Sequence, residues 1–195
     1  WLRRDSLKKI ESMKVINDNF TRRIIKRARM EELTLDIDAM EIEAEKYYAE
    51  YTYNGVKGYM PLLGFISELD LCCGYEFREG NVAPQEKNYE FTREIIEKVE
   101  SVGKKIKNFR TDSAGYQAKL MNYLDKRGTK YTITADQDEA VKEVIRSIKS
   151  NEWGRLKDRD GFETNREYAQ TIHTMNETDH AFRLIVQRWK NPQRD

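Results

Sequence analysis

The chain has 195 residues, of which 38% are apolar and 35% charged, and its formal net charge is +1. This length suffices for one domain with a sizeable core, and no run is long and apolar enough to span a membrane. The near-neutral charge excludes a uniformly basic coat for nucleic acid, so the distribution of charge matters more than its sum. The adjacent cysteines, Cys72 and Cys73, are expected to be free thiols in a reducing compartment.

The first segment is rich in basic residues. Its apolar side chains recur at spacings of three and four, at Leu7, Ile10, Met13, Ile16, Phe20, Ile24 and Ala28. This spacing predicts an amphipathic helix over residues 5–31 with a basic outer face. The outer face includes four neighbouring cations: Arg22, Arg23, Lys26 and Arg27. They form either an ordinary solvated helix face or a contact surface for DNA phosphates.

A short run from Leu33 to Ala39 follows, rich in branched residues and carrying two acids. In an extended strand, side chains two positions apart share a face, so Asp36 and Asp38 are expected to point the same way. One interpretation is a strand with an exposed acidic face. The other is a metal site, because acids in an apolar strand usually need a compensating charge. A second strand-like run, which ends on Asp112, favours the metal site.

The remaining pattern predicts the mixed α/β class, with a mixed sheet flanked by helices. Residues 59–69 and 71–78 read as an antiparallel hairpin, whereas residues 40–53 fit either a helix or an ordered loop. Further helices are expected over 84–102, 115–127 and 136–149, with strands over 106–111 and 131–135 between them. A second hairpin is expected over 168–175 and 181–189, after a loop over 153–161. The expected organisation is therefore a basic helix (1–32), a core (33–150) and a hairpin insertion (151–195).

Four motifs carry a family resemblance. In chain order they are Leu35-Asp36-Ile37-Asp38-Ala39, Gly58-Tyr59-Met60-Pro61-Leu62, Arg78-Glu79-Gly80-Asn81 and Arg110-Thr111-Asp112-Ser113-Ala114. Their order and spacing resemble those of DDE-type insertion-sequence transposases, whose catalytic core has the ribonuclease-H-like fold. The closing hairpin resembles the β-rich insertion that these enzymes carry before their last catalytic helix.

The resemblance implies DNA strand cleavage and strand transfer, with Mg²⁺ or Mn²⁺ held by a triad of acids. The first two acids of such a triad lie on the first and fourth strands, which gives Asp38 and Asp112 as catalytic and metal-binding residues. Asp36 and Asp38 are both candidates for the first position. Asp38 is preferred because it lies nearer the carboxyl end of its strand, where sites of open α/β sheets gather, and Asp36 is then a supporting acid. Arg78 and Asn81 are further candidates for contacting DNA or positioning the acids.

In the family the third acid is a glutamate on a helix beyond the insertion, and we expect this chain to be a C-terminally truncated, inactive fragment without it. The implied partners are transposon ends and target DNA, with a homodimer of the full-length protein and a bacterial cytoplasmic, nucleoid-associated location. The alternative function is a non-catalytic nucleic-acid-binding or interaction relic of a transposase. The third acid is what distinguishes the two functions.

Overall fold

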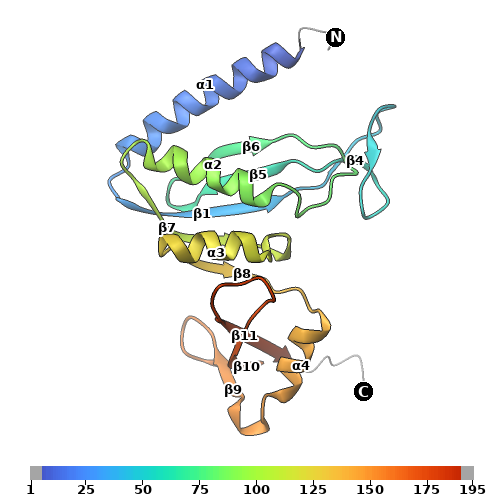
Figure 1. Cartoon of the computed structure of the whole chain (residues 1–195), viewed down its shortest axis with the longest axis vertical. Helices are drawn as coiled ribbons and strands as arrows, with labels where there is room; N and C mark the ends of the chain where they lie inside the picture. The colour runs from blue at the N-terminus through green and yellow to red at the C-terminus, as the bar shows by residue number, and fades with distance from the viewer. Residues whose placement is uncertain (1–5, 190–195) are drawn as a thin grey trace. The chain divides into compact units, whose positions relative to one another are not determined.

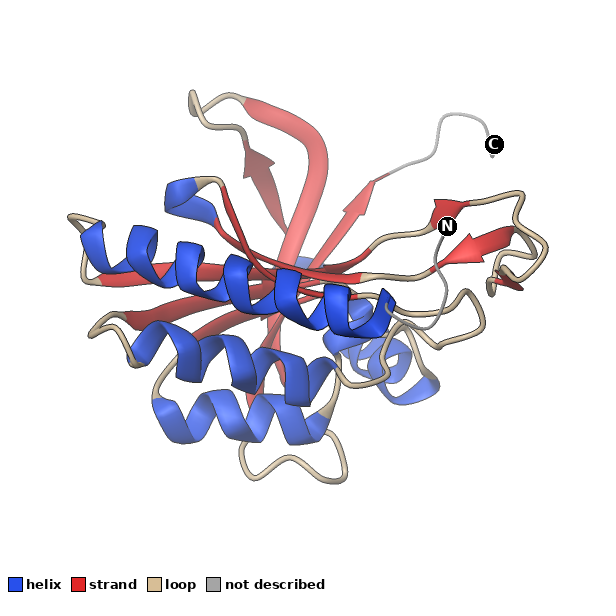
Figure 2. Ribbon diagram, turned by 90° about the horizontal axis from the view of Figure 1, so that it is seen from above, coloured by secondary structure: helices blue, strands red, loops and turns tan. Residues whose placement is uncertain are grey.

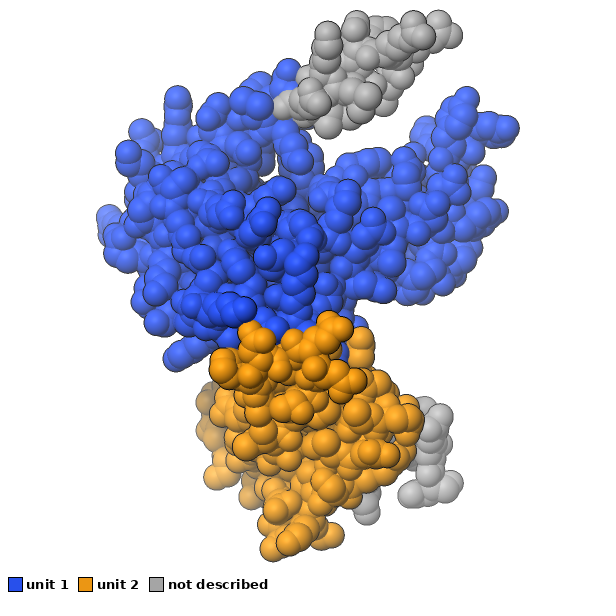
Figure 3. Space-filling view, viewed as in Figure 1, with its two compact units in different colours: residues 1–134 blue, residues 135–195 orange. Residues whose placement is uncertain are grey.

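The computed structural model describes residues 6–189, and its chain forms two compact units, residues 1–134 and 135–195 (Figure 3). The boundary lies after Thr134, whereas the sequence pattern placed it after residue 150. The difference arises because α4 (Glu139–Ser147) contacts β10 (Glu163–His173) of the second unit. The N-terminal helix α1 (Ser6–Arg27) belongs to the first unit, where it contacts β6 (Leu71–Glu76) and α2 (Asn88–Glu100).

The first unit is built on a five-stranded mixed sheet (Figure 1). Its spatial order is β6, β5 (Leu62–Ile66), β1 (Glu32–Ala39), β7 (Lys105–Thr111) and β8 (Lys130–Ile133). β1 pairs antiparallel with β5 and parallel with β7, and β7 pairs parallel with β8. The hairpin β5–β6 encloses a short 3-10 turn, η1 (Ser67–Leu69). The predicted mixed α/β, ribonuclease-H-like architecture is confirmed by this arrangement.

One face of the sheet carries the hydrophobic core, and α1, α2 and α3 (Ala118–Arg127) lie on that side (Figure 2). The alternation along β1 decides which side chains take part. Leu33, Leu35 and Ile37 are buried in the core, whereas Thr34, Asp36 and Asp38 lie on the opposite face and are at least partly exposed. Burying a branched apolar side chain contributes roughly 1.5–3 kcal/mol to stability. The burial of Leu33, Leu35 and Ile37 therefore keeps Asp36 and Asp38 on the opposite face of the sheet.

Helix α1 confirms the expected helix but not its expected packing face. Thr21 and Ile25 are fully buried, whereas Met13, Ile16 and Phe20 are 60–67% exposed. The side chains of Leu7 and Ile10 lie outside the described part. The helix is held along its second half, where Asp18 pairs with Lys98, and its first half diverges from the sheet (Figure 1). The first unit therefore does not bury the apolar side chains Met13, Ile16 and Phe20, which the spacing of three and four places on the packing face.

Residues 40–53, which the sequence pattern leaves unassigned, form a small sheet together with residues 54–59. Its order is β2 (Ile42–Glu43), β4 (Lys57–Tyr59) and β3 (Glu50–Tyr51). Gly80 packs against it so closely that an added Cβ would lie 2.4 Å from the Glu50 carbonyl oxygen. The segment is thus an ordered extension of the β1–β5 connection.

The second unit contains α4, a 3-10 turn η3 (Ser150–Glu152) and a three-stranded antiparallel sheet. The sheet consists of β9 (Gly154–Lys157), β10 and β11 (Phe182–Trp189). β10 pairs with β11 from Arg166↔Trp189 to His173↔Phe182, which confirms the predicted hairpin, while β9 lies in a segment expected to be a loop. Among the helices within residues 6–189, none combines the length and apolarity that a membrane span requires.

Candidate active site

The pairing of β1 with β7 brings the predicted acids together. Asp36 lies opposite Arg110 and Ile37 opposite Thr111, so Asp38 and Asp112 follow at the same carboxyl ends of neighbouring parallel strands. Both carboxylates are exposed, on the sheet face that the core does not occupy. The predicted convergence of Asp38 and Asp112 therefore has its structural basis in this register.

Asp36 lies on the same face but is already paired. Arg110 donates from Nε and Nη2 to its two carboxylate oxygens at 2.6 and 2.7 Å, and Ser67 also donates to it. The bonds from Arg110 hold the pKa of Asp36 below its ordinary value against partial burial, which acts the other way. Asp36 is thus an anchored anion, with both oxygens occupied by protein donors.

The environment of Asp38 disfavours its charged form, whereas that of Asp36 favours it. Partial burial and then the nearby charge of Asp112 raise the pKa of its carboxyl group. Within residues 6–189, no cationic side chain compensates it. Asp38 is therefore an ionisable group whose charge the protein itself leaves unbalanced.

Asp112 is held by local backbone geometry. It is the residue before the 3-10 turn η2 (Ser113–Gly115), and its Oδ1 accepts the Ala114 N–H at 3.0 Å. The Asp112 carbonyl accepts the Gly115 N–H at 3.2 Å. One carboxylate oxygen is thereby fixed to the backbone, while the side chain remains accessible from solvent.

The donor set fits a divalent cation with a preference for oxygen. Mg²⁺ and Mn²⁺ take hard carboxylate ligands, and Mg²⁺ keeps several waters, so a few carboxylates suffice. Asp38, with its raised pKa and the charge of Asp112 nearby, presents the electrostatic condition that such an ion relieves. Within the described residues 6–189, no group of three or more His, Cys, Asp or Glu side chains is placed to hold a metal.

The four predicted basic residues of α1 occupy two environments. Arg23, Lys26 and Arg27 are exposed. Arg22 is half-buried against the end of α2, where it donates to the Ser101 hydroxyl and, at 3.5 Å, to the Lys98 carbonyl. An exposed basic surface therefore remains on α1, but Arg22 contributes to packing as well.

Arg78 requires a correction, since the structure does not leave it free to contact DNA. Its side chain is 4% exposed, and it donates to the carbonyls of Met60 at 2.6 Å, Glu86 at 2.9 Å and Pro84 at 3.3 Å. Burial lowers the pKa of its guanidinium, although a group of this basicity stays charged. Asn81, in contrast, is exposed.

The sequence patterns do not mark Arg110, Asn88 or Gln117 as functional residues. Arg110 could have been found from the period of a strand, because it lies two residues before Asp112 and so shares its face. Asn88 and Gln117 have no such signal, since both act through bonds to distant backbone carbonyls. These contacts depend on tertiary structure.

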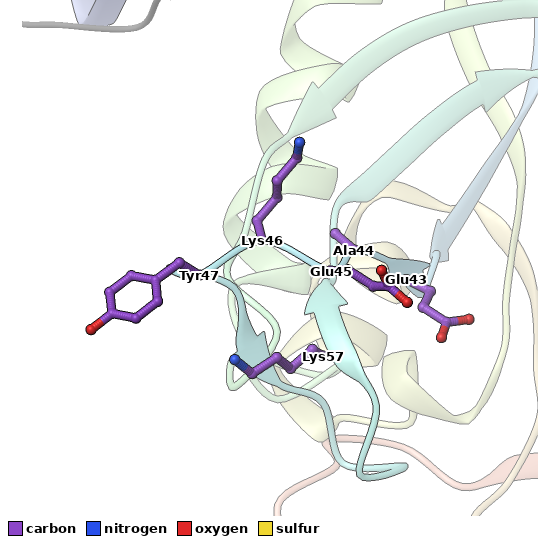
Figure 4. A pocket seen from close by; sticks show the side chains of 6 residues that line it. All are labelled: Glu43, Ala44, Glu45, Lys46, Tyr47 and Lys57. Carbon is purple, nitrogen blue, oxygen red and sulfur yellow. The ribbon is translucent and has the colours of Figure 1, made fainter.

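A surface hollow lies away from these residues, at the small sheet. Figure 4 shows its lining, with Glu43 and Glu45 on one side, Lys46 and Lys57 on the other, and the Tyr47 ring directed outward. Neither Asp38 nor Asp112 lines it. It is therefore separate from the candidate active site.

Comparison with known families gives one match that covers almost the whole chain. The family described as transposase DDE domain group 1 matches residues 1–194. A comparison with curated proteins finds no match.

Similar solved structures include two of the HTLV-2 integrase catalytic core domain in complex with magnesium, in its dimeric and trimeric forms. They are 11% and 12% identical in sequence, with TM-scores of 0.36 and 0.34. Each covers 62% of this chain and 70% of the integrase chain.

Proposed function

Because the chain belongs to the transposase DDE domain group 1 family, we propose that Asp38 and Asp112 are two of the acids of its catalytic site. The chain is a transposase catalytic-core domain, and DNA is the substrate of this class. The observation that supports the assignment is the register of β1 and β7. It brings two carboxylates to the same end of neighbouring strands and leaves the charge of Asp38 unbalanced.

The two carboxylates would hold Mg²⁺ or Mn²⁺. When bound, such an ion activates the attacking oxygen and stabilises the leaving oxygen in phosphoryl transfer. The Ala114 N–H fixes Oδ1 of Asp112, and the other carboxylate oxygen of Asp112 would bind the ion. Asp36 is not a ligand in this proposal. It pairs with Arg110 and so keeps that cation away from Asp38.

The substrates that we propose are transposon ends and target DNA, contacted in part by the exposed cations Arg23, Lys26 and Arg27 of α1. Dimerisation of the full-length protein and a location at the bacterial nucleoid are parts of the same proposal. The non-catalytic alternative has no observation in its favour within the described residues.

Two carboxylates are fewer than the triad of the family provides, and we propose that residues 1–195 alone do not cleave DNA. With few anionic ligands the divalent ion should bind weakly, since Mg²⁺ loses its water reluctantly.

The test is a Mn²⁺ titration of the isotope-labelled chain, followed by paramagnetic broadening of backbone amide NMR signals. Amides near residues 38 and 112 should broaden first, and Asp38→Asn or Asp112→Asn should each remove this local effect. Asp125→Asn, on the exposed surface of α3, is the matched control and should leave it unchanged. Broadening that persists in either site variant would overturn the assignment.

A cleavage assay completes the test. Incubation with transposon-end DNA and either metal should give no product from residues 1–195. Metal-dependent cleavage that both Asp38→Ala and Asp112→Ala abolish would show that two acids suffice in this chain. The metal site would then stand, and the proposed inactivity would be wrong.

A further inference from the structure

The backbone around the two acids is connected by three buried or half-buried polar side chains, those of Arg78, Asn88 and Gln117. Asn88 and Gln117 both donate to the carbonyl oxygen of Ala114, each at 2.9 Å. Asn88 is 2% exposed. The N–H of the same Ala114 residue donates to the Asp112 carboxylate. The side chains of Asn88 and Gln117 therefore hold the residue that holds Asp112.

The same contacts extend through the loop before α2. Gln117 also donates to the Gln85 carbonyl at 2.8 Å, while Arg78 donates to the carbonyls on either side, those of Pro84 and Glu86. Three successive carbonyl oxygens of this loop are thus bound by two side chains. A loop whose carbonyls are bound in this way has little freedom to shift relative to the sheet.

The far end of the connection reaches the strand of Asp38. Arg78 binds Met60 twice: its Nε donates to the Met60 carbonyl, and its own carbonyl accepts the Met60 N–H at 3.0 Å. The next residue, Pro61, accepts the N–H of Met40, which follows Asp38 by two positions, at 2.9 Å. Hydrogen bonds therefore connect the end of β1 to the turn that carries Asp112.

We propose that Gln117, Asn88 and Arg78 form a polar bridge that fixes the position of the Asp112 carboxylate relative to Asp38 and so prepares the metal site. The inference deepens the proposed function and rests on its metal site. These are positioning residues, because each acts through backbone groups and none binds the metal. Their effect is large because a single 3-10 turn has poor hydrogen-bond geometry and is weakly fixed by itself.

Loss of the bridge would change the position of the Asp112 carboxylate relative to Asp38, while both metal ligands would remain present. A functional constellation needs its groups held within about 0.5 Å, which requires support from surrounding hydrogen bonds. Asp112 is exposed and follows the end of β7, and its support along the chain comes from the N–H groups of Ala114 and Gly115, which belong to the same 3-10 turn. The bridge fixes that turn from its buried side.

The test compares Gln117→Met with Gln85→Ala. The first variant keeps the approximate volume of the side chain and removes both donated bonds. The second removes an exposed side chain but keeps the backbone carbonyl that Gln117 binds. Amide hydrogen exchange of residues 113–116 is measured without metal, and the Mn²⁺ concentration that halves the Ala114 amide signal is measured by NMR.

For Gln117→Met we expect about tenfold faster exchange in the turn and about tenfold more Mn²⁺ for half-broadening, which corresponds to about 1.4 kcal/mol each. Thermal unfolding should remain cooperative, and Gln85→Ala should match the wild-type chain in both measurements. Asn88→Asp, which also loses a donor to Ala114, should change both in the same direction.

Unchanged exchange of residues 113–116 in Gln117→Met overturns the bridge, whatever the Mn²⁺ result. Faster exchange with unchanged Mn²⁺ broadening also overturns it, since the turn would then loosen without affecting the site. Failure of the metal site itself is a different result: Mn²⁺ broadening of the wild-type chain that survives Asp112→Asn.

Discussion

Asp36 and Arg110 face each other across β1 and β7 and form a two-bond ion pair, one strand repeat before Asp38 and Asp112. The same face of the sheet thus carries an acid paired with a cation and, at the ends of the strands, two neighbouring acids. The order has a chemical consequence, because Arg110 is the nearest cation of β7 to the acids and is engaged by Asp36. Asp38 and Asp112 are left available to a metal ion.

The first prediction concerns the pH dependence of this ion pair. Arg110 lowers the pKa of Asp36 from its ordinary value of 3.8, so the stabilisation is fully present above that value and is lost as pH falls through the lowered pKa. Asp36→Asn should therefore reduce the free energy of unfolding at pH 7 by about 0.5–1 kcal/mol, since Arg110 is more than half exposed. Urea unfolding at several pH values should show the gap between the variant and wild-type curves narrowing as pH falls below 3.8. A gap that stays constant as the pH is lowered would contradict the electrostatic origin.

A second prediction concerns Asp38 without metal. Its pKa is raised by partial burial and by Asp112, so ionisation of Asp38 opposes folding above its ordinary pKa. Asp38→Asn should leave the metal-free chain as stable at pH 7 or raise its free energy of unfolding by up to about 1 kcal/mol. At pH 3, where the acid is mostly protonated, the gain should disappear. Urea unfolding in EDTA measures both, and a clear loss of stability at pH 7 would refute the prediction.

The third prediction concerns DNA binding by α1. Joint replacement of Arg23, Lys26 and Arg27 by Gln should weaken binding to duplex DNA and reduce the slope of log K against log [salt] by up to about 3, at about 0.9 per phosphate contact. The charge-preserving variant Arg23→Lys, Lys26→Arg, Arg27→Lys is the control and should keep the slope. Fluorescence anisotropy from 50 to 200 mM salt gives both values. An unchanged slope in the Gln variant would mean that these residues form a solvated face.

The effect of neutralising Arg22 should differ from that of its neighbours. Arg22→Gln removes contacts to Ser101 and the Lys98 carbonyl, so it should lower the free energy of unfolding by about 1 kcal/mol. Arg23→Gln, one position away and exposed, should change it by less than about 0.5 kcal/mol. Urea denaturation of the two variants makes the comparison. Equal stabilities would show that the Arg22 contacts contribute nothing measurable.

A further prediction separates structural from DNA-binding roles of arginine. Arg78→Met should lower the free energy of unfolding by about 3 kcal/mol or more, because it leaves three carbonyl acceptors without their donor. Arg93→Met, which removes an exposed arginine paired with Glu97, should cost less than about 1 kcal/mol. Chemical denaturation measures both. A similar small cost at the two positions would be inconsistent with the buried role of Arg78.

The sequence by itself determined much of the sheet and of the acid pair. The branched run of β1 alternates with Asp36 and Asp38, and this period of two requires both acids to leave the core when Leu33, Leu35 and Ile37 enter it. The second hairpin followed from the same local periodicity. Such features depend on neighbouring residues, so they can be read along the chain.

Tertiary structure decided which charges are free. The sequence left Asp36 and Asp38 as alternatives, and only the pairing of β1 with β7 gives Arg110 to Asp36. It also buried Arg78, which looked like a surface cation, and left Met13, Ile16 and Phe20 of α1 exposed despite their apolar spacing. The physical reason is the same in each case. The environment of a charge or an apolar side chain depends on groups that lie far away in the chain, and local periodicity contains no information about them.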